Sequence, residues 1–156
     1  MSTTPVLAPV PGRAVPLSDV PDPVFSAGMV GYGAAVDPPR EVIEAVAPVT
    51  GKVLKLLPHA YVIMTADNVG VLVHLGLDTV ALDGEGFTTH VTQGDEVTAG
   101  QTVITYDVPA IAAKGLNPIV PVVVMDQRQP DNITPAEAVF EGAVVAPGDG
   151  LFTAGT

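Results

Sequence analysis

Two of the three histidines lie at the ends of a stretch that is typical of a β-hairpin. His59 precedes an apolar run at 60–65, and His74 lies near the end of a second apolar run at 70–75. Opposed residues of an antiparallel pair have a constant sum of positions, so a turn centred between 66 and 67 would place His59 opposite His74. We therefore expect both imidazoles on one face, with Cβ atoms about 5 Å apart if directly opposed and about 7–8 Å apart if diagonal.

Such a pair is suited to two kinds of chemistry. A neutral imidazole with an ordinary pKa of about 6.5 is a nucleophile near pH 7, provided that a hydrogen bond holds its other ring nitrogen. A second imidazole alongside can donate to an incoming oxyanion, which favours acceptance of a phosphoryl group. The same pair could ligate zinc. A single histidine at a strand end is more often a satisfied surface residue, and from the residues alone the functional and structural interpretations are about evenly balanced.

The remaining candidates carry weaker signals. His90 has no comparable partner, and we expect it to be a loop residue without a role. Asp22 and Asp78 could equally be solvated loop carboxylates, and Phe25 could be an ordinary core residue. The chain has no cysteine, which excludes disulfides, thiolate zinc sites and thiol nucleophiles.

The charge balance narrows the classes of partner. Seventeen acidic residues against six basic ones give a formal net charge of −11, which disfavours binding to nucleic acid or to an anionic membrane surface and is compatible with a basic protein partner. The longest apolar stretch, 119–125, contains a proline and is too short to span a bilayer. The N-terminus lacks the pattern of a signal peptide. We therefore expect a cytoplasmic protein without membrane insertion.

Composition predicts the architecture that must position these side chains. The chain has 156 residues, 16 glycines and 16 prolines, and short Val-rich runs between turn signals. This pattern predicts an all-β fold, an antiparallel β-sandwich or barrel, in a single domain with at most one or two short helical turns. Residues 109–115 are the best helical candidate, because a proline lies near the start and a glycine past the end. We expect residues 1–5 to be a flexible N-terminus and 6–156 to be the domain.

Four motifs occur in the order and spacing of a known family. They are Val-Pro-Asp-Pro-Val-Phe at 20–25, His-Ala at 59–60, Val-His-Leu-Gly-Leu-Asp-Thr-Val at 73–80 and Gly-Glu-Gly-Phe at 84–87. Over residues 6–125 the chain closely resembles the glucose-type enzyme IIA of the bacterial phosphoenolpyruvate-dependent sugar phosphotransferase system. The resemblance implies a β-sandwich of the barrel-sandwich hybrid type, with 6–156 as an enzyme IIA type 1 domain.

The resemblance also implies a function. Members are cytoplasmic phosphocarriers that take a phosphoryl group from phosphohistidine on the carrier HPr and pass it to a cysteine of enzyme IIB, while the membrane component IIC moves the sugar. The phosphorylated histidine falls on His74, which reacts through Nε2, and the histidine that holds the phosphoryl group falls on His59. The active-site acids match Asp22 and Asp78. The apolar docking surface matches Phe25, Met29, Val30, Leu72 and Val80.

The chain departs from the family pattern at two positions. Some members have a threonine two residues before the first histidine, where this chain has Leu57, so that something else, such as a backbone carbonyl, must orient His59. One position of the usual aromatic docking patch is Lys55. No IIB or IIC sequence is attached, and we expect a free-standing monomer that needs no cofactor.

Three other classes of protein are alternatives to a phosphocarrier. A biotinyl or lipoyl carrier is rejected, because the hairpin tip at 106–109 lacks the lysine that bears the cofactor. A lysostaphin-type metallopeptidase needs a His-x-His motif, and Leu75 and Gly76 follow His74 instead. A non-catalytic regulatory protein of the same fold stays open, including one that shares a zinc ion with a partner through His59 and His74. The sequence does not identify the sugar, for which glucose and N-acetylglucosamine are the obvious candidates.

Overall fold

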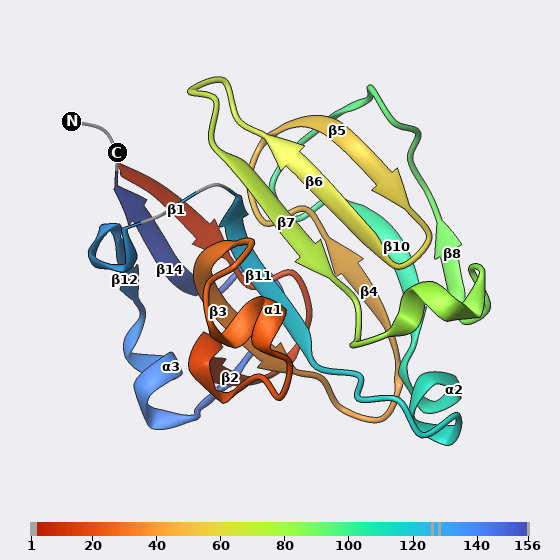
Figure 1. Ribbon diagram of the computed structural model, residues 1–156. Helices are drawn as coiled ribbons and strands as arrows, with labels where there is room; N and C mark the ends of the chain where they lie inside the picture. Colours follow the sequence, from red (N-terminus) through yellow and green to blue (C-terminus); the bar gives the residue numbers. More distant parts are fainter. Residues whose placement is uncertain (1–2, 126, 128, 156) are drawn as a thin grey trace.

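Val- and Ala-rich segments form the strands of a mainly antiparallel β-structure (Figure 1). The computed structural model describes residues 3–125, 127 and 129–155. An eight-stranded sheet has the spatial order β13-β2-β3-β11-β7-β6-β5-β9. Its strands are β2 (Gly12–Pro16), β3 (Gly31–Asp37), β5 (Gly51–Leu57), β6 (Ala60–Met64), β7 (Gly70–His74), β9 (Glu96–Val97), β11 (Val120–Met125) and β13 (Val144–Val145).

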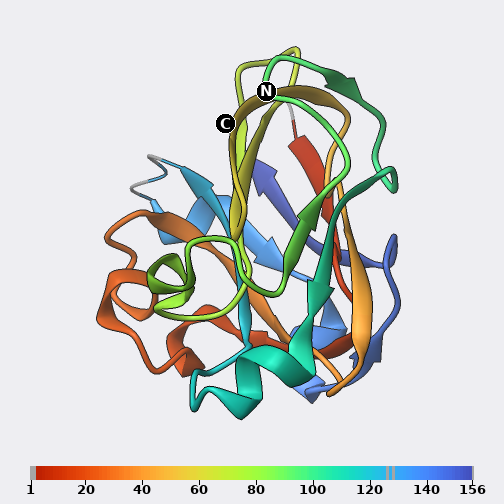
Figure 2. The ribbon, with the colours of Figure 1, turned by 90° about the vertical axis from the view of Figure 1, so that its right-hand side faces the viewer.

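Two smaller sheets complete the structure. One has the order β4-β10-β8 and consists of β4 (Val42–Val46), β8 (Phe87–Thr89) and β10 (Thr102–Asp107). The other has the order β1-β14-β12 and consists of β1 (Thr3–Leu7), β12 (Ile133–Pro135) and β14 (Gly150–Gly155). In Figure 2 the β4-β10-β8 sheet lies on one side of the core and strands β6 and β7 lie on the other. The predicted all-β sandwich is therefore confirmed.

The helical segments are short but more numerous than the one or two turns expected. They are the α-helices α1 (Pro23–Ser26), α2 (Val108–Ala113) and α3 (Glu137–Glu141), with 3-10 turns at Leu17–Asp19, Thr79–Leu82 and Pro130–Asn132. Helix α2 confirms the helix predicted at 109–115, with Pro109 in its first turn and Gly115 at a φ of 80° just beyond its end. A helix as short as α1 has no apolar period that the sequence could show. Among the described residues, no helix is both long and apolar enough to cross a membrane.

The described part of the chain begins with strand β1. Residues 3–5, which we expected to be flexible, belong to β1 and pair with β14, for example Pro5 with Thr153. Residues 1 and 2 lie outside the described part of the chain. The first strand therefore pairs with the last one, β14, in the same three-stranded sheet.

Strands β3, β7 and β11 are covered on both faces, and their side chains alternate between two apolar clusters. In β7, Val71 and Val73 belong to the main core, whereas Leu72 packs against a second cluster beneath α1. In β11, Val122 belongs to the main core and Val123 to the second cluster. A strand covered on both faces has a near-continuous apolar sequence, as 119–125 has, because neither face meets water. His74 is the last residue of one of these doubly covered strands.

The hairpin formed by β6 and β7 has a register one residue away from the predicted one. Ala60 lies opposite His74, and Met64 lies opposite Gly70. The backbone N–H of Thr65 donates to the carbonyl of Val69 at 3.0 Å, which leaves three residues, 66–68, in the loop. Asn68 takes the left-handed conformation, with a φ of 64°, that such a loop requires. The direct opposition of His59 and His74 was therefore wrong, because the loop has three residues where the sum assumed an even number.

Close backbone contact between β3 and β11 generates the first prediction. A Cβ atom on Gly33 would lie 2.0 Å from the carbonyl oxygen of Val122, a fixed backbone atom. We expect Gly33→Ala to lower the free energy of unfolding by about 1–3 kcal/mol, because the two strands must move apart. Urea unfolding measures this loss. Gly150→Ala is the matched control, since a Cβ there meets no atom within 4 Å, and an equal loss in both variants would contradict the prediction.

Candidate functional site

His74 ends β7, and the chain turns back immediately after it. The Nδ1–H of its half-buried ring donates to the carbonyl oxygen of Gly76 at 2.6 Å. A carbonyl can only accept, so the hydrogen lies on Nδ1 and Nε2 keeps its lone pair. The turn requires glycine, because Gly76 has a φ of 84° and an added Cβ would lie 2.6 Å from Cγ2 of Thr79. The backbone thus defines which nitrogen of His74 can act as a nucleophile.

The loop that carries this carbonyl is held from two sides. Gly76 N–H donates to the carbonyl of Ile119 at 3.1 Å, and Leu77 N–H donates to that of Asn117 at 2.8 Å. The hydroxyl of Thr79, which is fully buried, donates to the carbonyl of Leu75 at 2.8 Å. The sequence did not single out Thr79, although a threonine hydroxyl commonly donates to the backbone carbonyl four residues before it.

His59 reaches the same place from a turn rather than from a strand. The two-residue turn of Pro58 and His59 joins β5 to β6, where Leu57 pairs with Ala60. The His59 ring centroid lies 5.1 Å from that of His74, with 72° between the ring planes. The carbonyl of His59 also accepts from the Leu75 N–H at 2.7 Å. The two imidazoles are therefore neighbours as expected, since the alternation of side chains in a strand does not apply to a residue in a turn.

Two phenylalanines flank the histidine pair. The Phe25 ring, from α1, lies 5.3 Å from the His74 ring, and the Phe87 ring, from β8, lies 6.5 Å from the His59 ring. Among the described residues, no hydrogen bond reaches the His59 ring, so the expectation that a backbone carbonyl orients it finds no support there. In this structure the His59 ring instead contacts the rings of His74 and Phe87.

The two aspartates lie near His74 and act on its charge. The Asp22 carboxylate caps α1 by accepting from the Val24 N–H at 3.0 Å, and Asp78 has a left-handed backbone with a φ of 61°. Burial lowers the pKa of His74, while the bond to Gly76 and the charges of Asp22 and Asp78 oppose that shift. Burial also lowers the pKa of His59, and the neighbouring His74 lowers that pKa further. Both imidazoles are therefore neutral near pH 7.

The expected docking residues fall into two groups. Met29 and Val80 are 62% and 64% exposed, whereas Val30 and Leu72 are half-buried and pack against the second apolar cluster. Phe25 is only 5% exposed and belongs to that cluster. Its ring contacts that of His74 from within the protein, and its part in the docking surface stays a prediction.

His90 lies apart from this pair. Its exposed ring donates from Nε2 to the Thr105 hydroxyl at 2.6 Å, and that hydroxyl donates to the Glu44 carboxylate at 2.9 Å. These three residues lie along the β4-β10-β8 sheet.

Lys55 is exposed on β5. Within the described ranges, no group of three or more His, Cys, Asp or Glu side chains could hold a metal ion, so His59 and His74 alone would not complete a zinc site.

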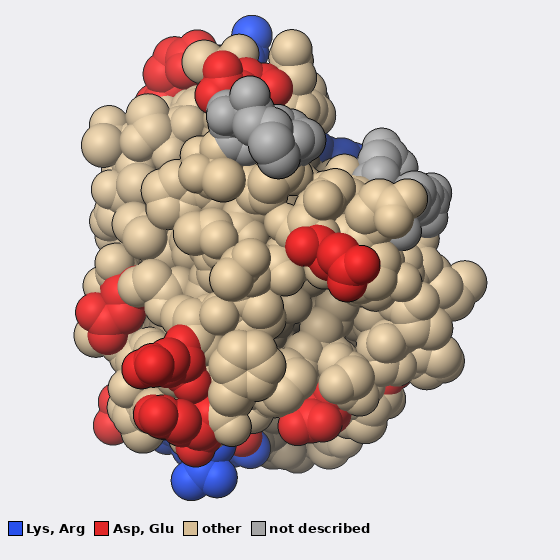
Figure 3. All heavy atoms as spheres, turned by 90° about the vertical axis from the view of Figure 1, so that its left-hand side faces the viewer, with Lys and Arg blue, Asp and Glu red and all other residues tan. Residues whose placement is uncertain are grey.

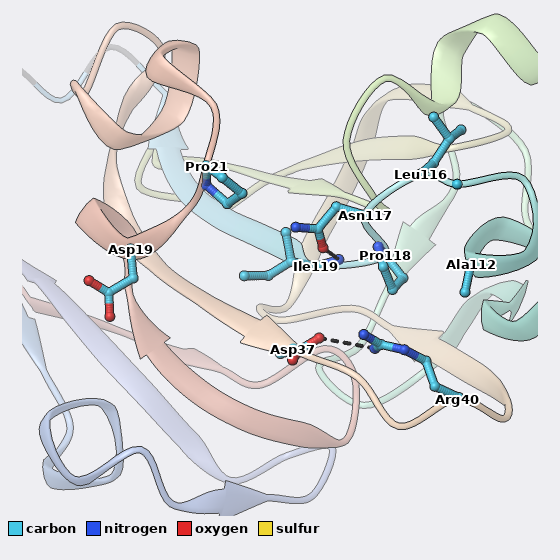
Figure 4. Close-up of a pocket in the computed structure, with 10 residues that line it drawn as sticks. Asp19, Pro21, Asp37, Arg40, Ala112, Leu116, Asn117, Pro118 and Ile119 are labelled. Atoms are coloured by element: carbon cyan, nitrogen blue, oxygen red, sulfur yellow. Dashed lines mark hydrogen bonds and ion pairs between the residues drawn. The ribbon is translucent and has the colours of Figure 1, made fainter.

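A surface hollow lies beside the 117–119 segment, which holds the turn at Gly76. A hollow of about 580 Å³ is lined by Asp37, Arg40 and the 117–119 segment, and Figure 4 shows the ion pair of Arg40 with Asp37, 3.1 Å long, at its edge. Neither His59 nor His74 lines it. On the face shown in Figure 3, Asp and Glu lie in several separate places, and Lys and Arg appear only at the margins.

The β-sandwich and its histidine pair agree with the comparisons with known proteins. Residues 4–130 match the family model described as the phosphoenolpyruvate-dependent sugar phosphotransferase system, EIIA 1. The protein is therefore a phosphotransferase component of a sugar phosphotransferase system, a phosphocarrier by class. It belongs to the EIIA 1 family, as the resemblance predicted.

Individual relatives differ in how much of their length the chain covers. It is 41% identical over 121 residues to the glucose-specific EIIA component of Oceanobacillus iheyensis, covering 76% of this chain and 72% of that protein. It is 44% identical over 119 residues to the mannose-specific EIIBCA component of Corynebacterium glutamicum, covering 76% of this chain but only 17% of that protein's length. The structure of glucose permease IIA from Mycoplasma capricolum has a TM-score of 0.85 at 34% identity, over 98% of this chain and 96% of that one.

The lowered pKa values of the two histidines generate a prediction about stability. The unfolded chain binds protons at the ordinary histidine pKa of about 6.5, whereas the folded protein binds them only at lower pH. The free energy of unfolding should therefore fall as the pH drops through and below about 6.5, down to the folded pKa values. Urea unfolding at pH 7.5 and 5.5 measures this fall. The double variant His59→Gln/His74→Gln should lose less stability over that range, and an equal loss would show that these histidines do not cause it.

Proposed function

We propose that this chain accepts a phosphoryl group from phosphohistidine on HPr at Nε2 of His74 and passes it to a cysteine of an enzyme IIB. The observation that carries the proposal is the bond from His74 Nδ1–H to the Gly76 carbonyl, which leaves Nε2 free beside a second imidazole. The family of the chain supports this role, and fused EIIBCA relatives support IIB and IIC components as partners.

The proposed transfer consists of two displacement reactions at phosphorus. The Nε2 lone pair of His74 attacks phosphorus, the P–N bond to the donor histidine breaks, and that histidine leaves with the electron pair. Because Nδ1 keeps its hydrogen, the phosphorylated ring of His74 carries a positive charge. The Gly76 carbonyl and the charges of Asp22 and Asp78 stabilise that ring. A IIB thiolate then attacks phosphorus, the Nε2–P bond breaks, and His74 returns to its neutral form.

His59 is suited to hold the phosphoryl oxygens on phosphorylated His74 during transfer to IIB. Its neutral ring has one N–H to donate, and it lies 5.1 Å from His74, centroid to centroid. The apolar surroundings, including the buried Phe25, exclude water and thereby slow hydrolysis of the phosphohistidine. Asp22 and Asp78 act on the charge of the His74 ring and not as general acids, because the leaving group needs no proton from them.

The negative net charge of the chain and its exposed apolar side chains are suited to a phosphoryl group that a partner protein delivers. The formal charge of −11 repels free phosphate anions and attracts basic carrier surfaces. Met29 and Val80, the most exposed of the expected docking residues, offer apolar area to a partner, with Val30 and Leu72 beside the second cluster. We place this exchange in the cytoplasm, with the chain acting as a monomer. The sugar, which we expect to be glucose or N-acetylglucosamine, is selected by the membrane component.

Two further possibilities belong to the same site. A zinc ion shared with a partner through His59 and His74 would need ligands from that partner, since the described residues provide no third one. A purely regulatory role of the unphosphorylated form gains no support from the comparisons, which match phosphotransferase components.

Removing the proposed nucleophile should abolish phosphorylation. Labelled phosphoenolpyruvate, enzyme I and HPr are mixed with the protein, and mass spectrometry locates the label. We expect HPr-dependent label on His74, labile in acid and stable in base, and none in His74→Ala. His90→Gln is the control and should be labelled like the wild type. Label retained on another histidine of His74→Ala would contradict the assignment.

The second histidine should matter for the second step. We expect His59→Gln to accept the phosphoryl group but to pass it to IIB at least about a hundredfold more slowly, because the group that orients the phosphoryl oxygens is changed. Single-turnover transfer from purified phosphorylated protein to IIB measures the rate. Normal transfer by His59→Gln would refute the role of His59.

A further inference from the structure

The orientation of His59 is the part of the site that hydrogen bonds among the described residues leave undefined. Leu57 occupies the position where some family members have a hydroxyl, and Leu57 is 38% exposed. The His59 residue is only 7% exposed, so neighbouring residues enclose it. Something packed against it must therefore determine which way it points.

Besides the His74 ring, the Phe87 ring also contacts that of His59. Their centroids are 6.5 Å apart with 61° between planes, an edge contact. Phe87 begins β8, where its backbone faces Tyr106 of β10 as a cross-strand partner. The rings of Phe87 and Tyr106 are stacked, 5.4 Å apart with 22° between planes.

Tyr106 is in turn fixed. It is fully buried, and its hydroxyl donates to the carbonyl of Pro118 at 2.9 Å. The residues on either side of Pro118 are Asn117 and Ile119, whose carbonyls accept from the loop that carries the Gly76 carbonyl. The 117–119 segment therefore supports both histidines, one through backbone hydrogen bonds and the other through two stacked rings.

The backbone before Phe87 is fixed as well. Gly86 has a φ of 93°, a Cβ there would lie 3.1 Å from Cδ1 of Ile111, and its carbonyl accepts from the Asp107 N–H at 2.9 Å. Gly84 lies against Pro58, with 3.4 Å from an added Cβ to the proline ring. Residues 84–87 thus pack against the turn that contains His59 and against α2.

We propose that Phe87 is a positioning residue, whose ring, held by its stack on Tyr106, aims the His59 imidazole at the phosphoryl group on His74. This inference rests on the proposed function, since it assigns the cause of His59's orientation in that reaction. In this chain a ring contact takes the place of the side-chain hydroxyl. A displacement of about 1 Å in such a group costs up to about a hundredfold in rate.

The test compares Phe87→Leu with Phe87→Tyr. We expect Phe87→Leu to weaken the nuclear Overhauser contacts between the ring protons of His59 and His74 in the unphosphorylated protein. We also expect it to slow single-turnover transfer from phosphorylated His74 to IIB by about ten- to a hundredfold. Phe87→Tyr keeps the ring and should restore both readouts. If Phe87→Leu does not fold, Phe87→Met, which keeps more of the volume, takes its place.

Phe152→Leu is the matched control, because Phe152 is a buried core phenylalanine of β14 in another sheet. Because Phe152 is more deeply buried than Phe87, this variant should lower the urea midpoint at least as much, and it should leave the ring contacts and the transfer rate unchanged. The inference is overturned if Phe87→Leu loses stability like the control and keeps both wild-type readouts. A wild type that takes no label from HPr would refute the proposed function instead, and the ring contacts of Phe87→Leu would still show whether Phe87 orients His59.

Discussion

The proposed chemistry of this protein depends on one short hydrogen bond, from Nδ1 of His74 to the carbonyl oxygen of Gly76. This bond selects the tautomer, turns Nε2 outward and keeps the ring fixed at the end of β7. It requires a left-handed residue without a Cβ two positions after the histidine, which is why Gly76 follows so closely. The bonds of Gly76 and Leu77 to the 117–119 segment then hold the carbonyl where the ring needs it.

Burial and charge act in opposite directions on the same ring. Burial favours the neutral imidazole, which is the form that can attack phosphorus, while Asp22 and Asp78 favour a positive ring, which forms once the phosphoryl group is attached. Neither effect removes the other, so both forms of the ring that the proposed transfer needs, the neutral one before it and the positive one after it, are stabilised. A site with burial alone would make the phosphorylated ring too costly, and a site with carboxylates alone would protonate the nucleophile near neutral pH.

Much of this arrangement could be predicted from the sequence, and the part that could not has physical causes. The Val-rich runs predicted the sandwich, the proline and glycine around 109–115 predicted α2, and the motif around His74 indicated the family. The register of β6 and β7 depends on whether the loop between them has an even or an odd number of residues, and apolar patterns do not encode that number. The burial of Phe25 depends on the short helix α1 folding over β7, a tertiary contact with no local signal. Thr79 and Phe87 act through neighbours that are distant in sequence, so their contributions appear only once the strands are paired.

The two-sided covering of β7 has a further consequence for how the sequence can change. Its side chains enter one apolar cluster on one face and a second cluster on the other, and both of its edges are paired, with β6 and β11. A shift of the strand by one residue would exchange the contents of both clusters at once. Insertions and deletions should therefore accumulate in the loop at 66–68, at the far end of the strand from His74. A change in the length of that loop would leave the pairing of β7 with β11, and with it the position of His74, unchanged.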